Sequence, residues 1–470
     1  MTFQAWAIIP FVVMLLGIAI FPLWPAMAKH WEKHSFQLIF SLILGVPVAI
    51  WLLLGGEHGF VVEKLWEYVQ FIILLFSLYV VSGGIFLAGD IRATPRNNTI
   101  FLAAGTVLAS FVGTTGAAML FIRPVLNTNS ERTHKAHTVL FLIFAVANCG
   151  GLLTPLGDPP LFLGFLAGVP FTWTFGLWAE WLFVNSLLLI SYYALDSRLY
   201  ASEPEQALLA DETERVPLAV RGGLNFLWLA AIVTAVAVAP SINLVAIEEG
   251  TATLAQMLPV REVIMLSAAA ASFFFTKKSV RFGDNEFGWG PIVEVATLFI
   301  GIFLTMMPAL KFLAQVAPSL PLNRITFFAF TGSLSSVLDN APTYLTFFEM
   351  ARTLTLPGAN VVAGVPEPYL IAISVGSVFC GAITYIGNGP NFMVKSVADS
   401  RGVRMPSFGG YIMRSFEHLV PILVAMCLLL IAESLMAHIV GGLIVLGVLA
   451  LAAVNLRRAR TARSAQEQAA

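Results

Sequence analysis

Two aspartates interrupt apolar segments, where an ionisable side chain is costly and therefore informative. Asp158 belongs to the stretch 148–162, in which an acid and three prolines break an apolar run long enough to cross a bilayer. Asp339 begins Asp339-Asn340-Ala341-Pro342, between two short apolar arms. Broken backbone with a carboxylate persists at membrane depth only where protein or a water-filled cavity satisfies it. Such a carboxylate can hold a sodium ion when ionised and a proton otherwise, so both acids are candidate sodium ligands. The alternative role of each acid is to cap a half-helix.

Hydroxyl and amide side chains accompany both acids and would complete the hard-oxygen set that a sodium ion needs. These candidate ion- or substrate-binding residues are Thr114, Thr115, Asn148, Thr154, Asn340, Thr343, Thr384, Asn388 and Asn391. Any single Thr or Asn could equally tie helices together. Glycines and prolines at the same places are predicted to shape the breaks rather than to touch cargo. They are Gly113, Gly116, Gly157, Pro160, Pro342, Gly387, Gly389 and Pro390. Glu294 opens another apolar span and is a candidate for a proton path, unless it lies shallowly in water.

The composition is that of a polytopic membrane protein. Of 470 residues, 58% are hydrophobic and 11% are charged, less than half the charge usual for a soluble domain. Apolar runs of about 20 residues recur, each matching the bilayer core. Nothing suggests nucleic acid as a partner or a bound cofactor. Cys149, Cys380 and Cys427 show no metal or disulfide spacing, so free buried thiols are expected.

The helices that position these residues can be predicted from the apolar runs and from the polar, Gly and Pro residues that interrupt them. We expect an all-α fold with about eleven crossings and two re-entrant hairpins. Spans are predicted near 5–27, 36–54, 66–88, 173–195, 223–246, 260–276 and 290–316, with two more after 396. The hairpins are predicted at 99–127 and 323–350, each with arms of about a dozen residues, and the broken spans at 138–168 and 367–396. In the first hairpin, Gly113 to Gly116 is the expected tip.

Basic clusters set the orientation. The loops at 29–33 and 277–281 and the tail at 457–463 each carry two or more Lys or Arg residues, and positive loops stay in the cytoplasm. The N-terminus is therefore expected outside and the C-terminus inside. The acidic segment 197–222 is predicted to be a solvated cytoplasmic linker without a functional role.

The two halves align at their unusual residues. Thr154, Gly157 and Pro160 match Thr384, Gly387 and Pro390 at an offset of 230 residues. The hairpin tips align at an offset of 225, and Glu67 aligns with Glu294 at 227. The charge rule makes the hairpins enter from opposite sides, which predicts inverted repeats around a midplane site. The predicted domains are a first repeat (1–196), the linker (197–222), a second repeat (223–435) and an extra span with a basic tail (436–470).

The broken stretch resembles a known motif. Asn148-x-Gly150-Gly151-x-x-Thr154-x-x-Gly157-Asp158-Pro159-Pro160 is similar to the broken-helix motif of the ion transporter superfamily, which includes NhaD-type sodium/proton antiporters, arsenite permeases, the melanosomal P protein and citrate or dicarboxylate carriers. The segment 339–342 resembles that superfamily's hairpin tip, and 293–298 its acid-led span. The resemblance implies an inner-membrane secondary transporter, a homodimer and an elevator-like movement.

Departures from the carriers bear on the cargo. Gly113-Thr114-Thr115 stands where dicarboxylate carriers show a Ser-Asn-Thr tip, and the second tip has an acid where an Asn-Thr pair is expected. Two acids at the centre disfavour an anion by like-charge repulsion. We therefore expect exchange of sodium or lithium for protons, with proton- or sodium-coupled citrate or dicarboxylate transport as the alternative. A membrane enzyme is disfavoured because no HExxH, GxSxG or Gly-rich phosphate loop occurs.

Overall fold

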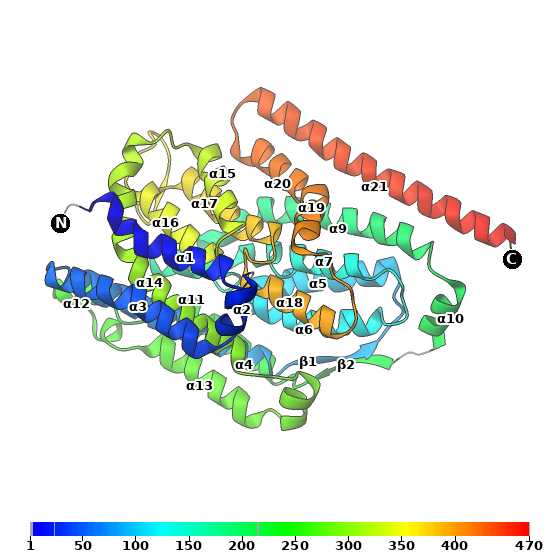
Figure 1. Ribbon diagram of the computed structural model, residues 1–470, viewed down its shortest axis with the longest axis horizontal. Helices are drawn as coiled ribbons and strands as arrows, with labels where there is room; N and C mark the ends of the chain where they lie inside the picture. The colour runs from blue at the N-terminus through cyan, green and yellow to red at the C-terminus, as the bar shows by residue number, and fades with distance from the viewer. Residues whose placement is uncertain (1–2, 23, 214–215, 470) are drawn as a thin grey trace.

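The chain folds almost entirely into helices (Figure 1). The computed structural model describes residues 3–22, 24–213 and 216–469. Six helices in this described part are long and apolar enough to cross a membrane, or eight if each of two bent pairs counts as one span. An all-α polytopic membrane protein is thereby confirmed. The predicted total of about eleven crossings includes broken spans, whose short half-helices do not meet that length criterion, and it stays a prediction, as does the inverted repeat.

One set of helices, the first helix group, is centred on α4 and α14. Its members are α1 (Ile9–Ile20), α2 (Pro25–Trp31), α3 (His34–Leu54), α4 (His58–Ser82), α11 (Asn225–Val238), α12 (Leu244–Glu248), α13 (Val260–Phe275) and α14 (Gly290–Val316). Helix α14 packs on α3 and α4, and α13 packs on α4 and α11. The first expected span is not straight, because α1 and α2 meet at 99°.

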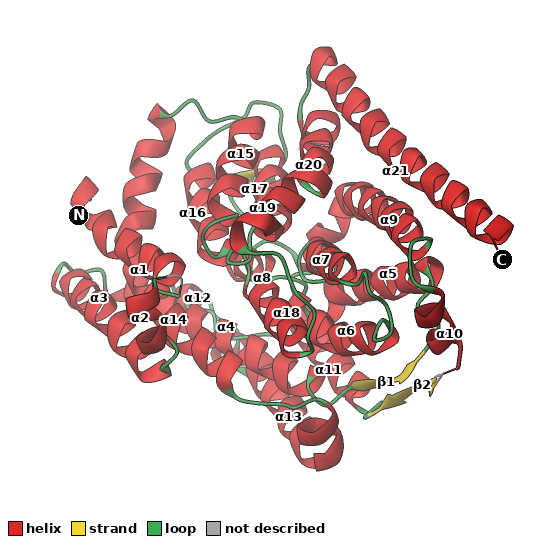
Figure 2. Ribbon diagram, turned by 45° about the vertical axis from the view of Figure 1, so that its right-hand side comes forward, coloured by secondary structure: helices red, strands yellow, loops and turns green. Residues whose placement is uncertain are grey.

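The other α-helices, apart from the short α10 (Glu205–Thr213) of the connecting segment 197–222, form the second helix group, which contains both predicted hairpins and both broken spans. They are α5 (Pro95–Val112), α6 (Thr114–Thr128), α7 (Ala136–Ala145), α8 (Pro159–Leu166), α9 (Trp178–Tyr200), α15 (Arg324–Ser335), α16 (Asn340–Arg352), α17 (Glu367–Cys380), α18 (Gly389–Ser400), α19 (Phe408–His418), α20 (Val420–Met426) and α21 (Leu435–Ala469). Helix α21 runs along the outside of α9 and α20 (Figure 2). The two groups meet where α16 packs on α14 and where α6 and α8 pack on α4.

The described chain passes between the groups three times, and two of these connections pair with each other. Strand β1 (Phe86–Asp90) follows α4, and β2 (Val216–Arg221) precedes α11. They form an antiparallel ribbon with Phe86 opposite Arg221, at the edge of the molecule (Figure 2). The span predicted at 66–88 therefore ends early, because its last residues belong to this ribbon. A second ribbon, β3 (Val361–Val362) with β4 (Val365–Pro366), closes the loop before α17.

The first hairpin has longer arms than expected. Helix α5 has 18 residues and α6 has 15, against about a dozen predicted per arm. The chain reverses at Gly113 alone, with φ of 82°, a conformation that L side chains adopt rarely. Thr114, Thr115 and Gly116 already belong to α6, so the predicted four-residue tip is wrong. The second hairpin turns over residues 336–339, between α15 and α16.

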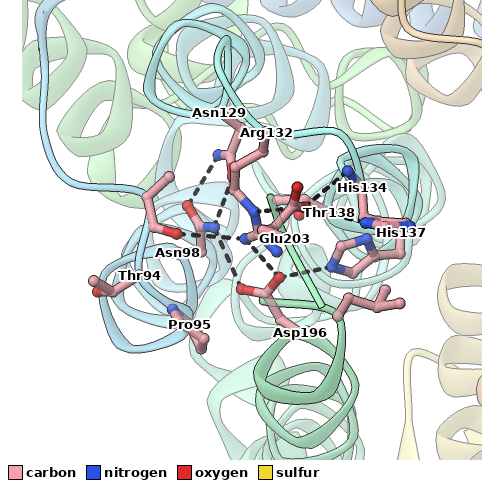
Figure 3. A network of polar contacts seen from close by, with 12 residues as sticks. Thr94, Pro95, Asn98, Asn129, Arg132, His134, His137, Thr138, Asp196 and Glu203 are labelled. Carbon is pink, nitrogen blue, oxygen red and sulfur yellow. Dashed lines mark hydrogen bonds and ion pairs between the residues drawn. The ribbon is translucent and has the colours of Figure 1, made fainter. Parts of the chain in front are cut away.

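A buried polar network ties the open end of the first hairpin to α9 (Figure 3). Arg132 Nη1 lies 2.7 Å from Asp196 Oδ1, and both side chains are almost fully buried. Asn98 of α5 and Asn129 after α6 exchange amide hydrogen bonds of 2.9 and 3.0 Å. His137 Nε2 lies 2.8 Å from the same Asp196 oxygen. Both arms of the hairpin are therefore held at their bases.

The segment 197–222, predicted to be a solvated linker, is folded and partly buried, although every residue of β2 is exposed. It contains the end of α9, helix α10 (Glu205–Thr213) and β2. The carboxylate of Glu203 is buried and accepts hydrogen bonds of 2.9 Å from the backbone N–H groups of Thr133 and His134. Burial raises the pKa of Glu203, but those N–H groups and the Arg132 charge outweigh it and the net pKa is lowered. Asp211, also buried, accepts from the N–H of Ala93. Glu203 and Asp211 thus belong to the packed structure, whereas Glu205 is exposed.

Candidate functional site

Asp158 is presented by the first broken span. Helix α7 ends at Ala145, a short 3-10 turn covers Cys149–Leu153, and α8 begins at Pro159. Proline suits the first helical position because its missing N–H would be unpaired there anyway. Gly157 crosses Gly151 so closely that a Cβ on Gly157 would lie 2.0 Å from the Gly151 carbonyl oxygen. The crossing requires glycine and places Asp158 immediately before α8.

The Asp158 carboxylate is where both hairpin tips and the second broken span meet. The residue is 1% exposed. Thr114 Oγ1 donates to Oδ1 at 2.9 Å, and Asn388 Nδ2 donates to the same oxygen at 3.2 Å. Asn340 Nδ2 donates to Oδ2 at 2.5 Å. Three neutral donors from three separate elements thus converge on one buried carboxylate, and hydrogen bonds to an ionised acceptor are the strong kind.

The two broken spans also bind each other through buried amides. Asn148 Nδ2 donates to Asn391 Oδ1 at 2.6 Å, and Asn388 Nδ2 donates to Asn148 Oδ1 at 3.1 Å. Asn391 Nδ2 in turn donates to the carbonyl oxygens of Gly381 and Thr384 at 2.8 and 2.9 Å. Asn148 of the first broken span and Asn388 and Asn391 of the second therefore form one amide chain beside Asp158.

Each broken span is fastened to its own hairpin by a threonine. Thr154 Oγ1 donates to the carbonyl oxygen of Ser110, and Thr384 Oγ1 donates to that of Ser336 at 2.5 Å. Each hydroxyl also accepts from the backbone two residues on. These two threonines are occupied by backbone, so the observed contacts of both are structural.

Ser110 and Ser336 were missed by sequence reasoning. Their spacing of 226 residues lies within one residue of the offset that aligns the two hairpin tips. Extending that alignment along the arms would have found both serines.

Asp339 lies beside this centre without touching Asp158. It is the N-cap residue of α16, and its Oδ1 accepts from the N–H of Ala341 at 3.0 Å. That is the capping contact which sequence analysis kept open as an alternative. The neighbouring residue Asn340 makes the contact with Asp158, and its Oδ1 is buried without a hydrogen-bond partner in the described part of the chain. Thr343 Oγ1 donates back to the Asp339 carbonyl oxygen at 3.0 Å.

The remaining predicted residues divide between shaping the breaks and lining a cavity. Pro160, Pro342 and Pro390 fall in the first turns of α8, α16 and α18, where a missing N–H costs no helical bond. A Cβ on Gly387 would lie 2.6 Å from the Gly381 carbonyl oxygen, whereas one on Gly389 would meet open space. Steric need thus explains Gly387 but not Gly389.

A cavity of about 100 Å³, the central cavity, adjoins Asp158. Its lining includes Thr114, Thr115 and Gly116 from the first hairpin and Gly389 from α18. Asp158 is the one charged side chain among the described residues that line it. Glu294 does not line it: the carboxylate is exposed on α14 and accepts from Gln37 Nε2 at 3.3 Å. A role of Glu294 in a proton path therefore stays a prediction.

The donor set fits a hard monovalent cation better than a transition metal. Within the described ranges, no three His, Cys, Asp or Glu side chains lie close enough to hold a metal ion. Around the Asp158 carboxylate lie one hydroxyl and two amide groups, which now present their nitrogens to it. Carboxylate, hydroxyl and amide groups carry the oxygen atoms that hard cations prefer.

Comparison with known proteins gives one family. Residues 1–431 match the family model CitMHS_2, whose description reads "Putative citrate transport". No curated protein matches the chain.

Proposed function

Since the chain belongs to the CitMHS_2 family of transporters, we propose that it is a secondary antiporter that exchanges sodium or lithium ions for protons. The family assignment agrees with the predicted resemblance to the ion transporter superfamily and with a multi-pass membrane transporter rather than an enzyme. The family description names citrate, whereas the residues of the site are the reason to propose a cation. The choice of cargo rests on the site.

The observation that carries this proposal is the environment of Asp158. Its carboxylate is buried, receives three neutral donors, and is the one charged group on the lining of the central cavity within the described chain. A buried carboxylate is tolerated when donors or a cation compensate its charge. A cation or a proton satisfies that need equally, so the two compete for one group. Competition of this kind couples the flow of one ion to the flow of the other.

The side chains around Asp158 can serve either occupant. With a cation bound, the Thr114 hydroxyl oxygen is a neutral ligand beside the carboxylate, and the Asn340 and Asn388 amides, which now present their nitrogens to Asp158, supply oxygens after they rotate. With a proton bound, Asp158 becomes a donor, and the unpartnered Asn340 Oδ1 is a ready acceptor. Rotation of the Asn340 amide thus exchanges a donor for an acceptor without moving the backbone.

We further propose a membrane orientation and a homodimeric assembly for this protein, and a role for Asp339. The protein lies in the inner membrane with its N-terminus outside and its C-terminus in the cytoplasm, as the basic clusters favour. It forms a homodimer, as the superfamily resemblance implies. Asp339 contributes its charge to ion binding in addition to capping α16, with Asp158 as the principal ligand.

A second candidate function is proton- or sodium-coupled citrate transport, which the family description favours. A tricarboxylate needs compensating positive charge, and no basic side chain lines the central cavity in the described part of the protein. If citrate is the cargo, it must therefore arrive with a cation that Asp158 accepts.

The experiment that separates the two uses purified protein in proteoliposomes with an imposed pH gradient. Adding sodium or lithium should collapse the gradient, whereas potassium or citrate alone should not. Asp158→Asn should abolish the response, and Glu349→Gln, which removes an acid paired with Arg352 within α16, should retain it. Uptake of labelled citrate with no response to cations would overturn the antiport proposal and favour the second candidate.

A further inference from the structure

A second cavity of about 230 Å³, the vestibule, continues from the central cavity toward the side predicted to be cytoplasmic. The two cavities share five lining residues, which come from both helix groups: Tyr79, Thr115, Gly116, Pro291 and Met393. The vestibule adds Arg123 of α6 and the loop 285–288 before α14. A solute between Asp158 and this side of the protein would pass these residues.

Arg123 presents an obstacle to a cation on that route. Its side chain is about nine-tenths buried, and its Nε has no hydrogen-bond partner in the described chain. A guanidinium stays charged at every physiological pH. An unneutralised positive charge on the wall of a narrow, low-dielectric passage would repel a cation and attract an anion.

Glu286 supplies the neutralising charge from the opposite helix group. Its Oε2 lies 3.4 Å from Arg123 Nη2, and its Oε1 lies 3.8 Å from Nη2 of Arg401, which follows α18. Arg401 also donates to Asn127 Oδ1 at 3.4 Å. One carboxylate of the first group thus faces two guanidinium groups of the second, at the mouth of the vestibule.

The backbone holds Glu286 in this place. Its φ is 47°, a left-handed conformation uncommon for a residue with a side chain. The loop around it is fastened to the end of α4, because Asn285 Nδ2 donates to the carbonyl oxygens of Gly83 and Ile85 and Tyr79 Oη donates to that of Gly288. The Glu286 side chain itself is 65% exposed, so its ion pairs add little stability. An electrostatic role explains the arrangement better than a stabilising one.

We infer that Glu286 sets the charge selectivity of the vestibule: it offsets Arg123, the other charged side chain among the described residues of the vestibule lining, and so admits cations to Asp158. This inference rests on the proposed cation exchange for its biological meaning. The electrostatic effect itself does not depend on which ion is transported, so it can be measured separately.

The test places a reporter cysteine at Met119, which lines the vestibule, in purified full-length protein. The native cysteines are buried, and the parent protein without the reporter gives their background. The measured quantity is the ratio of modification rates with a cationic and an anionic methanethiosulfonate reagent at low ionic strength. Glu286→Gln should lower the cationic-to-anionic ratio about tenfold, since charged clefts change encounter rates by about 10- to 1,000-fold. Added choline chloride should shrink the difference.

Three further variants make the result decisive. Glu286→Gly removes the carboxylate while suiting the left-handed backbone, so it reports if the Gln variant fails to fold. Arg123→Gln combined with Glu286→Gln should restore the ratio, and Glu349→Gln should leave it unchanged. An unchanged ratio in both Glu286 variants would overturn the inference, as would a double variant that behaves like Glu286→Gln alone.

Transport assays then connect the vestibule to function. In everted vesicles, Glu286→Gln should raise the KM for sodium about tenfold, with a smaller effect on the maximal rate. Absence of sodium exchange in the unaltered protein refutes the proposed function and leaves the reactivity ratio as the test of Glu286. Normal exchange with an unchanged sodium KM would instead refute the role of Glu286 in admitting cations.

Discussion

Replacing Asp158 by Asn removes the charge at the centre while keeping almost the same volume. The Asp158 carboxylate accepts one hydrogen bond from each of Thr114, Asn388 and Asn340. An Asn oxygen in the place of Oδ1 would keep the first two. Its NH₂ group would face the Asn340 NH₂ group unless the Asn340 amide turns, and the unpartnered Asn340 Oδ1 permits that turn.

The loss of folding stability in Asp158→Asn can be estimated from these three hydrogen bonds. Three hydrogen bonds to a charged acceptor become neutral ones, and one must be rearranged. Hydrogen bonds to charged groups contribute about 1.5–3 kcal/mol and neutral ones about 0.5–1.5. Burial of an uncompensated charge offsets part of the difference. We expect Asp158→Asn to lower the free energy of unfolding by about 1–3 kcal/mol, so the variant should accumulate and purify.

The loss of ion binding can be measured separately from this loss of stability, because only the former depends on the sodium concentration. A ligand at one hundred times its Kd stabilises the folded state by about 2.7 kcal/mol. The wild type should show a sodium-dependent rise in thermal stability of that order, and Asp158→Asn should show none. Thermal unfolding followed by tryptophan fluorescence, with choline in place of sodium as the control, measures both effects. Sodium-dependent stabilisation or proton exchange that survives in Asp158→Asn would refute Asp158 as the ion ligand.

Other perturbations test the remaining parts of the structure. Asp339→Asn should keep the cap of α16, since Asn is a good N-cap, whereas Asp339→Ala should lower the free energy of unfolding by about 1 kcal/mol. If Asp339→Asn slows ion exchange without changing thermal stability, the charge of Asp339 takes part in ion binding. Ion exchange at the wild-type rate would leave helix capping as the role of Asp339. Arg132→Met leaves Asp196 and Glu203 buried without their guanidinium and should cost about 3–5 kcal/mol in thermal unfolding, while Arg414→Met, which breaks an exposed pair within α19, should cost less than about 1. The lowered pKa of Glu203 means that its contribution to stability is present above the unfolded value of about 4.3 and is lost as the pH falls through the lower folded value. The protection factors of residues 129–135 in hydrogen exchange, corrected for the intrinsic rate at each pH, should therefore fall as the pH drops below that unfolded value; protection factors that stay constant would contradict the anchoring role. Gly157→Ala should lower the free energy of unfolding by about 4 kcal/mol or more, because its Cβ would lie 2.0 Å from the Gly151 carbonyl oxygen. Its folded yield should therefore fall severely, whereas Gly389→Ala should give the wild-type yield.

The sequence was most informative where a polar or charged residue interrupts an apolar run. An acid beside two prolines in an apolar run identified the break at Asp158, and the same reasoning identified Asn340 and Asn388, which contact it. Asp339 shows the limit of that reasoning. An acid at a hairpin tip has the same local signature whether it caps a helix or faces an ion, and only the direction of the side chain distinguishes the two.

The burial of acidic residues in polar segments was not predicted. Glu203 and Asp211 lie in a segment whose composition is that of a solvated loop, yet both are buried. Their burial depends on N–H groups of Thr133, His134 and Ala93, which are distant in sequence. Local composition carries no information about such donors, and the pairing of β1 with β2 escaped prediction for the same reason.

The β1–β2 ribbon restricts how the two helix groups can move. Three connections join the groups, and the hydrogen bonds of the ribbon merge two of them into one strut. The third is the short segment 317–323 between α14 and α15. A body held at two places turns most easily about the line through them, so the ribbon and this segment define the natural axis for rotation of one group against the other. Mechanically, the small sheet at the edge of the molecule acts as one end of a hinge.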